Sequence, residues 1–304
     1  MSTHGSRPAD APAPTPPPAQ TPARSLQEQV RQHLTRFTDA ERRVAQALLA
    51  DYPVAGLETV ARFAKRAGTS SPTILRFVSR LGFHTYADFQ NALHEEIHVR
   101  LQGPLTRYPA RSQPAERDLA ENISRAFSDN IARVGKSLQP DDLREIIALL
   151  CDVEHTVFFL GGRFSHLLAS YFHHYMRELH PQVRLVRDTS AAWADYLLDV
   201  KPGDVLVTFD FRRYQADVLE FARAAAAQGA RILLITDVWY SPIASLAHKV
   251  VPCPVEIPSA FDSGVAGLAA VEIIVSAVIE ELGPDARERM AALEDLRKSF
   301  RLGQ

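Results

Sequence analysis

The sequence predicts a two-domain protein, with an all-α N-terminal domain and a C-terminal α/β domain built on a parallel sheet. The chain has 304 residues, which is long enough for two separate hydrophobic cores. Residues 25–101 show only helical periodicity between Pro and Gly breaks. From residue 116 onward, apolar runs of strand length alternate with helical patterns, which is typical of a parallel sheet covered on both faces.

The composition is that of a globular protein, with 46% hydrophobic and 23% charged residues. No apolar run approaches the roughly 20 residues that span a bilayer, and the N-terminus lacks an apolar signal core. Cys151 and Cys253 lie in apolar contexts that are typical of buried, reduced thiols. We therefore expect a cytoplasmic protein without a membrane partner.

Four segments follow one another along the chain. Residues 1–24 are rich in Pro and Ala and are expected to form a disordered tail. Residues 25–101 form the helical domain, 102–115 have the composition of a linker, and 116–304 form the α/β domain. Residues 24–100 carry 11 Lys and Arg against 8 Asp and Glu, although the whole chain has 34 against 36. This small basic excess hints at a nucleic-acid partner.

Helix start and stop signals divide the N-terminal domain. Thr38 and Glu41 form a capping box, Pro53 stops the first helix, and Gly68 follows the second. Thr85 with Asp88 opens the last helix. The expected helices cover roughly residues 39–52, 57–67, 71–81 and 86–100.

The third of these helices has an apolar face and a polar face. Ser70 and Ser71 lie at its N-terminal tip, and Thr73, Arg76 and Arg80 share its polar face. Two short helices joined by a Gly-containing turn, with small polar residues at the start of the second, indicate a helix-turn-helix. These five residues are the predicted DNA-binding residues, because Ser and Thr fit the major groove and Arg bonds to guanine or phosphate. A helical bundle with a solvated basic face is the alternative.

The run from FTDAERRVAQALLADYP through ETVARFAKRAGTSSPTILRFVSRLGFHTYADFQNAL resembles the N-terminal helix-turn-helix of the RpiR/MurR family of bacterial transcription regulators. The resemblance covers nearly all of residues 34–97 and is densest around Thr73-x-x-Arg76-Phe77. It implies a double-stranded DNA operator as partner. One recognition helix reads few base pairs, so we expect a homodimer or homotetramer on a nearly palindromic site.

The C-terminal domain is expected to hold five strands near residues 155–160, 183–186, 204–209, 231–235 and 250–255. Helices are expected over 141–150, 167–179, 191–198, 214–228 and 265–282. Ligands of parallel sheets bind at the carboxyl ends of the strands. The stretch VTFDFRRYQ at 207–215 runs from one such strand into a helix, and it is therefore expected at the ligand site.

The C-terminal domain resembles the sugar isomerase (SIS) domain that RpiR-type regulators carry as a sensor, through Gly161 and Ser165 after the first strand and a Phe-Asp-Ser turn at 261–263. In the family, the loop after the third strand is a Ser/Thr/Gly-rich cradle for a sugar phosphate. Here that loop holds charged residues, which favour an anionic effector bound by guanidinium groups. The predicted ligand-binding residues are Arg163, Ser165, Asp210, Arg212, Arg213 and Ser263.

Other interpretations of these residues remain open. Arg212 or Arg213 could pair with Asp210 or Asp237 and only hold the loop, and Ser165 and Ser263 could simply cap helices. The histidines at 166, 173 and 174 lack a second ligand pair at metal-binding spacing. We therefore expect no metal and no cofactor.

The expected function is that of a DNA-binding transcriptional regulator whose SIS-like domain senses a small anionic metabolite: a sugar acid, a sugar phosphate or an amino-acid-like molecule. The first alternative is an architectural DNA-binding protein whose second domain only dimerises. The second is a sugar-phosphate isomerase with Glu256 and His248 as loose candidates for its base. We expect no catalytic residues, because the phosphate loop that an isomerase needs is replaced.

Overall fold

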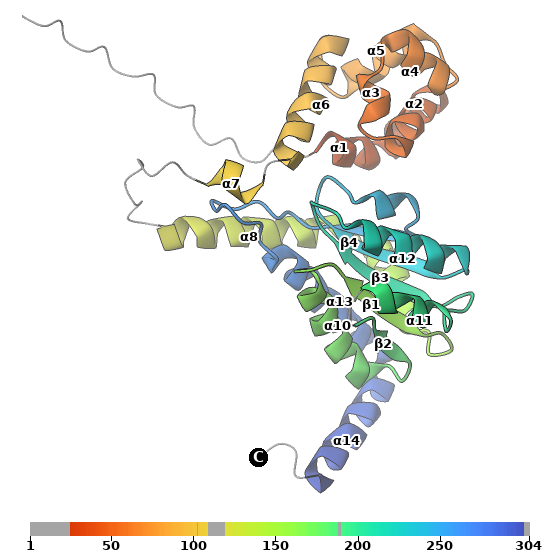
Figure 1. The fold of residues 1–304 in the computed structure, drawn as a ribbon, viewed down its shortest axis with the longest axis vertical. Helices are drawn as coiled ribbons and strands as arrows, with labels where there is room; N and C mark the ends of the chain where they lie inside the picture. The colour runs from red at the N-terminus through yellow and green to blue at the C-terminus, as the bar shows by residue number, and fades with distance from the viewer. Residues whose placement is uncertain (1–24, 102, 109–118, 188–189, 301–304) are drawn as a thin grey trace, which may run out of the picture.

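A computed structural model describes residues 25–101, 103–108, 119–187 and 190–300. The expected tail at 1–24 and most of the linker, 109–118, lie outside these ranges. A helical N-terminal domain lies over one edge of a C-terminal α/β domain (Figure 1). The predicted fold class is confirmed for both domains.

Seven short helices form the N-terminal domain. They are α1 (Leu26–Gln32), η1 (Leu34–Arg36), α2 (Asp39–Ala50), α3 (Val54–Leu57), α4 (Val60–Arg66), α5 (Ser71–Arg80) and α6 (Tyr86–Leu101). The capping box of Thr38 and Glu41 is confirmed, since each side chain bonds to the backbone of the other. The helix expected over 57–67 is divided, because the chain is extended at Glu58 and Thr59 caps a new helix there.

The core of this domain comes from one face of each helix. Val44 and Leu48 of α2, Phe63 of α4, and Ile74 and Phe77 of α5 are all fully buried. This packing fixes α5 against α4 and α2, so its opposite face is directed outward.

The C-terminal domain is built on a five-stranded parallel sheet. Its strands are β1 (Val157–Gly161), β2 (Val183–Leu185), β3 (Val205–Asp210), β4 (Arg231–Thr236) and β5 (Lys249–Pro252). The strand order is β2-β1-β3-β4-β5, and every neighbouring pair is parallel. All carboxyl ends therefore meet at one edge of the sheet, where the loop after β4 contacts the N-terminal domain through a hydrogen bond from Ser25 to the carbonyl of Val238.

Helices cover both faces of the sheet. One face packs on α8 (Leu119–Ser137), α9 (Pro140–Leu150), α10 (His166–Leu179) and α13 (Val265–Leu282). The other packs on α11 (Trp193–Leu197), α12 (Ala216–Ala227) and η3 (Pro242–Ser245), with η2 (Ser190–Ala192) beside them. Alternate residues of β1 and β3 enter the two cores, as a sheet buried on both sides requires.

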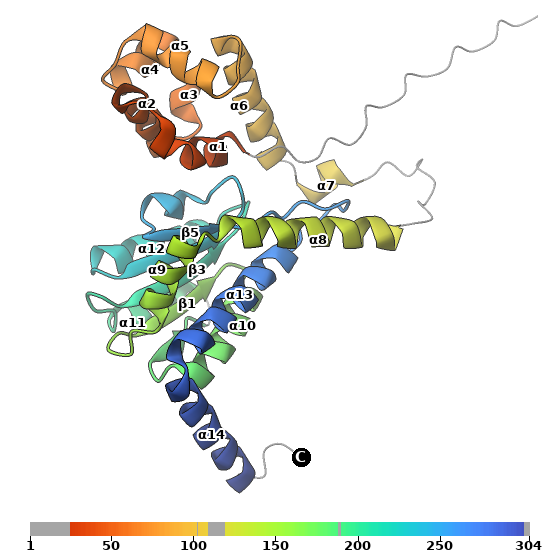
Figure 2. The ribbon, with the colours of Figure 1, turned by 180° about the vertical axis from the view of Figure 1, so that it is seen from behind.

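Two further helices lie within the described ranges. The helix α7 (Pro104–Arg107) lies in the predicted linker, and α14 (Pro284–Ser299) extends away from the sheet after a turn at Gly283 (Figure 2). Only Ala286 of α14 is buried. Within the described ranges, no helix is both long enough and apolar enough to cross a membrane.

Candidate functional site

The first candidate site is the polar face of α5. The turn from α4 into α5 reverses at Gly68, whose φ of +58° lies in the left-handed region that glycine adopts without strain. The backbone N–H of Thr69 bonds to the carbonyl of Ala64 at 2.9 Å and closes the end of α4. The structure thus has the helix-turn-helix arrangement that the sequence predicted.

Three of the predicted DNA-binding residues form a hydrogen-bonded chain at the start of α5. The hydroxyls of Ser70 and Thr73 are 3.0 Å apart, and Nη2 of Arg76 donates to Oγ1 of Thr73 at 3.0 Å. Thr73 is only 4% exposed, whereas Arg76 and Ser70 are exposed and Ser71 is half-buried. Thr73 therefore lies beneath Arg76 and orients it, a role that spacing alone could not distinguish from direct contact.

Arg80 is held by the N-terminus of α2. Its Nη1 donates to the carbonyl of Arg36 at 2.9 Å and lies 3.2 Å from Oε2 of the buried Glu41. Burial opposes ionisation of Glu41, but its hydrogen bonds with Thr38 and the charges of Arg80 and Arg76 hold its pKa below the usual value. Arg80 thus connects α5 to the capping box of α2.

The second candidate site is the carboxyl edge of the sheet. Ser165 joins the loop after β1 to the end of β3, because its Oγ donates to the carbonyl of Phe209 at 2.7 Å and accepts from the N–H of Gly162 at 2.8 Å. The N–H of Arg163 bonds to the side chain of Gln215, while its guanidinium is exposed and stacks 5.1 Å from the ring of Phe164. The side chain of Ser165 therefore connects the loop after β1 to β3 and makes no capping hydrogen bond to α10, which was the alternative that the sequence left open. The side chain of Arg163 faces solvent.

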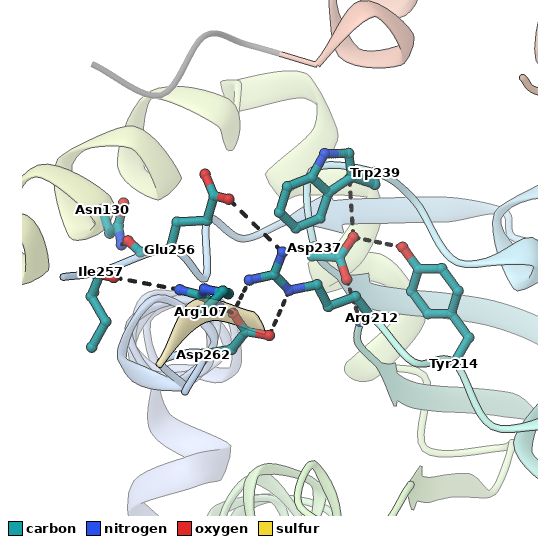
Figure 3. A network of polar contacts seen from close by, with 9 residues as sticks. All are labelled: Arg107, Asn130, Arg212, Tyr214, Asp237, Trp239, Glu256, Ile257 and Asp262. Atoms are coloured by element: carbon teal, nitrogen blue, oxygen red, sulfur yellow. Dashed lines mark hydrogen bonds and ion pairs between the residues drawn. The ribbon is translucent and has the colours of Figure 1, made fainter. Parts of the chain in front are cut away.

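Arg212 is the centre of a buried polar network (Figure 3). Its side chain is 2% exposed and pairs with Asp262 through two nitrogens, with Nε donating to Oδ2 at 2.6 Å. Glu256 lies 3.8 Å from Nη1, and the guanidinium stacks 4.6 Å above the ring of Trp239. Burial works against its charge, but the hydrogen bonds and charge of Asp262 hold the pKa of Arg212 above its usual value.

Other parts of the chain support this network. The N–H of Arg212 and the hydroxyl of Tyr214 both donate to the buried carboxylate of Asp237. Nη1 of Arg107, on the linker helix α7, donates to Oδ1 of Asp262 at 2.6 Å. The sequence suggested only Asp210 and Asp237 as partners of Arg212. It missed Asp262 and Arg107, which are distant in sequence.

Asp210 and the remaining predicted ligand-binding residues make contacts of other kinds. Arg213 is exposed and has a φ of +60°. Oγ of Ser263 accepts from the N–H of Val265 at 3.1 Å, but the N-cap of α13 is Gly264, so this bond is not a capping bond of the kind that the sequence left open. Asp210 is 2% exposed and accepts hydrogen bonds from Ser241 and from the backbone of Gln215. Burial raises the pKa of Asp210 to about 6, more than its hydrogen bonds lower it.

The raised pKa of Asp210 predicts a pH-dependent effect of Asp210→Asn. Because the pKa of about 6 in the folded protein exceeds the roughly 3.9 of an exposed Asp, ionisation costs stability as pH rises through this window. Relative to the variant, the wild-type protein should therefore lose about 1–3 kcal/mol of unfolding free energy between pH 4 and pH 7. Urea unfolding of both proteins at several pH values measures the difference. A difference that is constant with pH would contradict this assignment.

The structure also places the residues of metal-binding type. In the ranges that the structure describes, no three His, Cys, Asp or Glu side chains gather to hold a metal ion. His173 is buried against the ring of Phe159, and burial lowers its pKa to about 4. The bases considered for an isomerase lie apart, because His248 precedes β5 at the amino edge of the sheet and Glu256 follows β5 at the carboxyl edge.

Comparison with protein families assigns both halves of the chain. Residues 24–99 match the helix-turn-helix domain of the rpiR family, and residues 151–277 match the SIS domain. The HTH-type transcriptional regulator HexR of Pseudomonas aeruginosa is 24% identical over 288 residues, which cover 90% of this chain and 95% of that protein.

Two solved structures share the fold. The sugar isomerase domain of an RpiR transcription factor from Sphaerobacter thermophilus superposes with a TM-score of 0.55 at 18% identity, covering 59% of this chain and 99% of that domain. The Vibrio vulnificus NanR protein complexed with ManNAc-6P superposes with a TM-score of 0.51 at 19% identity, covering 90% of this chain and 98% of NanR.

Proposed function

We propose that this chain, which belongs to the RpiR family of helix-turn-helix transcriptional regulators with a SIS domain, binds operator DNA through α5 and responds to a small anionic metabolite. The observation that carries the DNA-binding part is the start of α5, where buried Thr73 orients exposed Arg76 beside Ser70 and Ser71. A pre-oriented guanidinium suits bidentate contact with guanine in the major groove.

Arg76→Ala should weaken operator binding by about 1–3 kcal/mol, roughly 5- to 150-fold, because a base contact is lost. The duplex is first selected from a random-sequence pool with the wild-type protein, and affinities are then measured by gel shift at fixed salt. Arg125→Ala is the matched control, since Arg125 is exposed on α8 and its partners among the described residues, Glu121 and Asn122, lie on the same helix. Equal affinities of the Arg76 and Arg125 variants would remove Arg76 from the interface.

The effector part of the proposal places the ligand at the carboxyl edge of the sheet. Arg163 and Arg213 carry exposed guanidiniums in the loops after β1 and β3, while Arg212, Asp210 and Ser263 are buried and Ser165 is half-buried. NanR, a relative of the same fold, is complexed with a sugar phosphate. We propose a sugar acid, a sugar phosphate or an amino-acid-like anion as the effector, because a guanidinium can bind either a carboxylate or a phosphate through two hydrogen bonds.

A thermal-shift screen of sugar phosphates, sugar acids and amino acids tests this class. A ligand at 100 times its dissociation constant should stabilise its domain by about 2.7 kcal/mol. The shift should shrink in Arg163→Ala combined with Arg213→Ala, which removes both exposed charges. A response limited to neutral or cationic compounds would contradict an anionic effector.

The other functions have weaker support. An isomerase would need a base beside the bound sugar, and the two candidates lie at opposite edges of the sheet. An architectural protein would not need a guanidinium network at the carboxyl edge. We propose that the regulator acts as a homodimer or homotetramer, since a nearly palindromic operator requires two copies of α5.

A further inference from the structure

Asp262 is shared between the candidate effector site and the linker. One of its carboxylate oxygens, Oδ1, accepts from Arg107 of α7 and from Arg212 of the loop after β3. These residues are 155 and 50 positions away in sequence. The hydrogen bonds and charges of both arginines hold the pKa of Asp262 below its usual value, although burial works in the other direction.

Arg107 has no other carboxylate partner in the described part of the chain, although its Nη2 also reaches the carbonyl of Ile257 at 3.5 Å. The helix α7 is a single turn and buries none of its residues. A turn of this length is not stable alone. The contact between Arg107 and Asp262 is therefore the main charged contact that fixes α7 on the SIS domain.

The loop after β4 gives the carboxyl edge a second contact with the N-terminal domain. Asp237, which holds the N–H of Arg212, is followed by Val238, whose carbonyl accepts from Oγ of Ser25 at 2.6 Å. Two residues later, the ring of Tyr240 lies 4.6 Å from the guanidinium of Arg31 on α1. The residues around Arg212 thus contact the DNA-binding domain directly as well as through the linker.

The charges of the network determine how an anion can enter it. The carboxylates of Glu256 and Asp262 lie beside the guanidinium of Arg212, and Asp262 also pairs with Arg107. A third carboxylate, that of Asp237, accepts from the backbone N–H of Arg212. The positive charge of Arg212 is already neutralised, and Asp262 occupies the side that a ligand carboxylate would take. An incoming anion can gain a bidentate contact with Arg212 only if Asp262 leaves.

We infer that Asp262 competes with the effector for Arg212, and that its displacement loosens Arg107 and the linker helix α7. This inference rests on the proposed anionic effector. Binding of an anion at Arg212 would in this way reach the DNA-binding domain. The effector then binds more tightly to the state in which Asp262 has left Arg212 than to the state in which they are paired. Regulation requires such a difference in affinity between two states.

The experiment uses the full chain with a nitroxide at Leu105→Cys, on the exposed face of α7, in a Cys151→Ser background that leaves only the buried Cys253. The line shape of the electron paramagnetic resonance spectrum reports the mobility of the nitroxide on α7. It is recorded for the parent protein, for Arg107→Gln, for Asp262→Asn and for the double variant. Arg125→Gln is the matched control. D-gluconate and D-glucose 6-phosphate are the probes, and their affinities are measured by calorimetry.

We expect Arg107→Gln and Asp262→Asn each to increase the mobility of α7, with no further increase in the double variant and none in the control. Saturating probe should mobilise α7 in the parent protein. Asp262→Asn should bind the same probe about ten-fold more tightly, because the competing carboxylate is lost.

Unchanged mobility in both single variants overturns the inference, because α7 would then not depend on this contact. A probe that binds the parent protein without moving α7, or that binds Asp262→Asn no more tightly, overturns the competition and leaves the proposed effector class intact. If neither probe binds either protein, the effector class and this inference fail together. DNA binding by α5 is then still decided by the Arg76 gel shifts.

Discussion

Arg212→Met is expected to lower the unfolding free energy of the SIS domain by about 3–5 kcal/mol, because removing one partner of a buried ion pair leaves the other charge uncompensated. Asp262 would keep only Arg107, and the methionine could not replace the hydrogen bonds of the guanidinium. Methionine ends near the position of Nε, so the stacking of the guanidinium on Trp239 would be lost as well. The lost stability should therefore combine the ion pair with this cation–π contact.

Urea unfolding followed by circular dichroism measures this effect. Arg213→Met is the matched control, because the neighbouring arginine is exposed and should change stability by less than about 0.5 kcal/mol. Adding Asp262→Asn to Arg212→Met should restore part of the stability, since the unpaired charge is then removed as well. Simple additivity of the two substitutions would show that the residues do not act as a pair.

Gly161→Ala is expected to destabilise the SIS domain by about 1–3 kcal/mol or more, because an added methyl group would overpack a rigid site. A Cβ at this position would lie 2.6 Å from the backbone atoms of Ser165 and His166, so no side chain can move aside to relieve the contact. The loop after β1 would have to shift and would disturb the bonds of Ser165 with Phe209 and Gly162.

Gly135→Ala is the control for this substitution. Gly135 lies inside α8, and an added methyl group there would meet nothing within 4 Å among the described residues. The change should stabilise the helix by roughly 0.5–1 kcal/mol. Opposite signs of the two shifts in unfolding midpoint are the expected result. Equal shifts would show that the loop after β1 can relax around a side chain.

The sequence predicted most of the fold because the local signals agree with the tertiary structure. The capping residues Thr38 and Thr85 mark helix starts, and the five apolar runs can only be strands of a sheet buried on both faces. The helix α14 was not predicted. It buries only Ala286, so it lacks the apolar stripe from which amphipathic helices are recognised.

The candidate site was predicted less completely, for a topological reason. Arg212 was expected at the carboxyl edge and lies there, but its partner comes from the turn after β5, two strands further along the sheet. No local pattern pairs residues 50 positions apart. Thr73 shows the same limit at smaller scale, because periodicity places it on the polar face of α5 although neighbouring hydroxyl and guanidinium groups cover it.

The position of α5 has a consequence for the timing of regulation. It lies at the end of the N-terminal domain remote from the sheet, and α1 lies between the two (Figures 1 and 2). DNA bound to α5 would therefore leave the carboxyl edge open to small molecules. A metabolite could enter while the protein is still on its operator, so a ternary complex is sterically allowed. The rate of the response would then be set by how fast the ternary complex dissociates. It would not be limited by the rate at which the regulator leaves DNA without the metabolite.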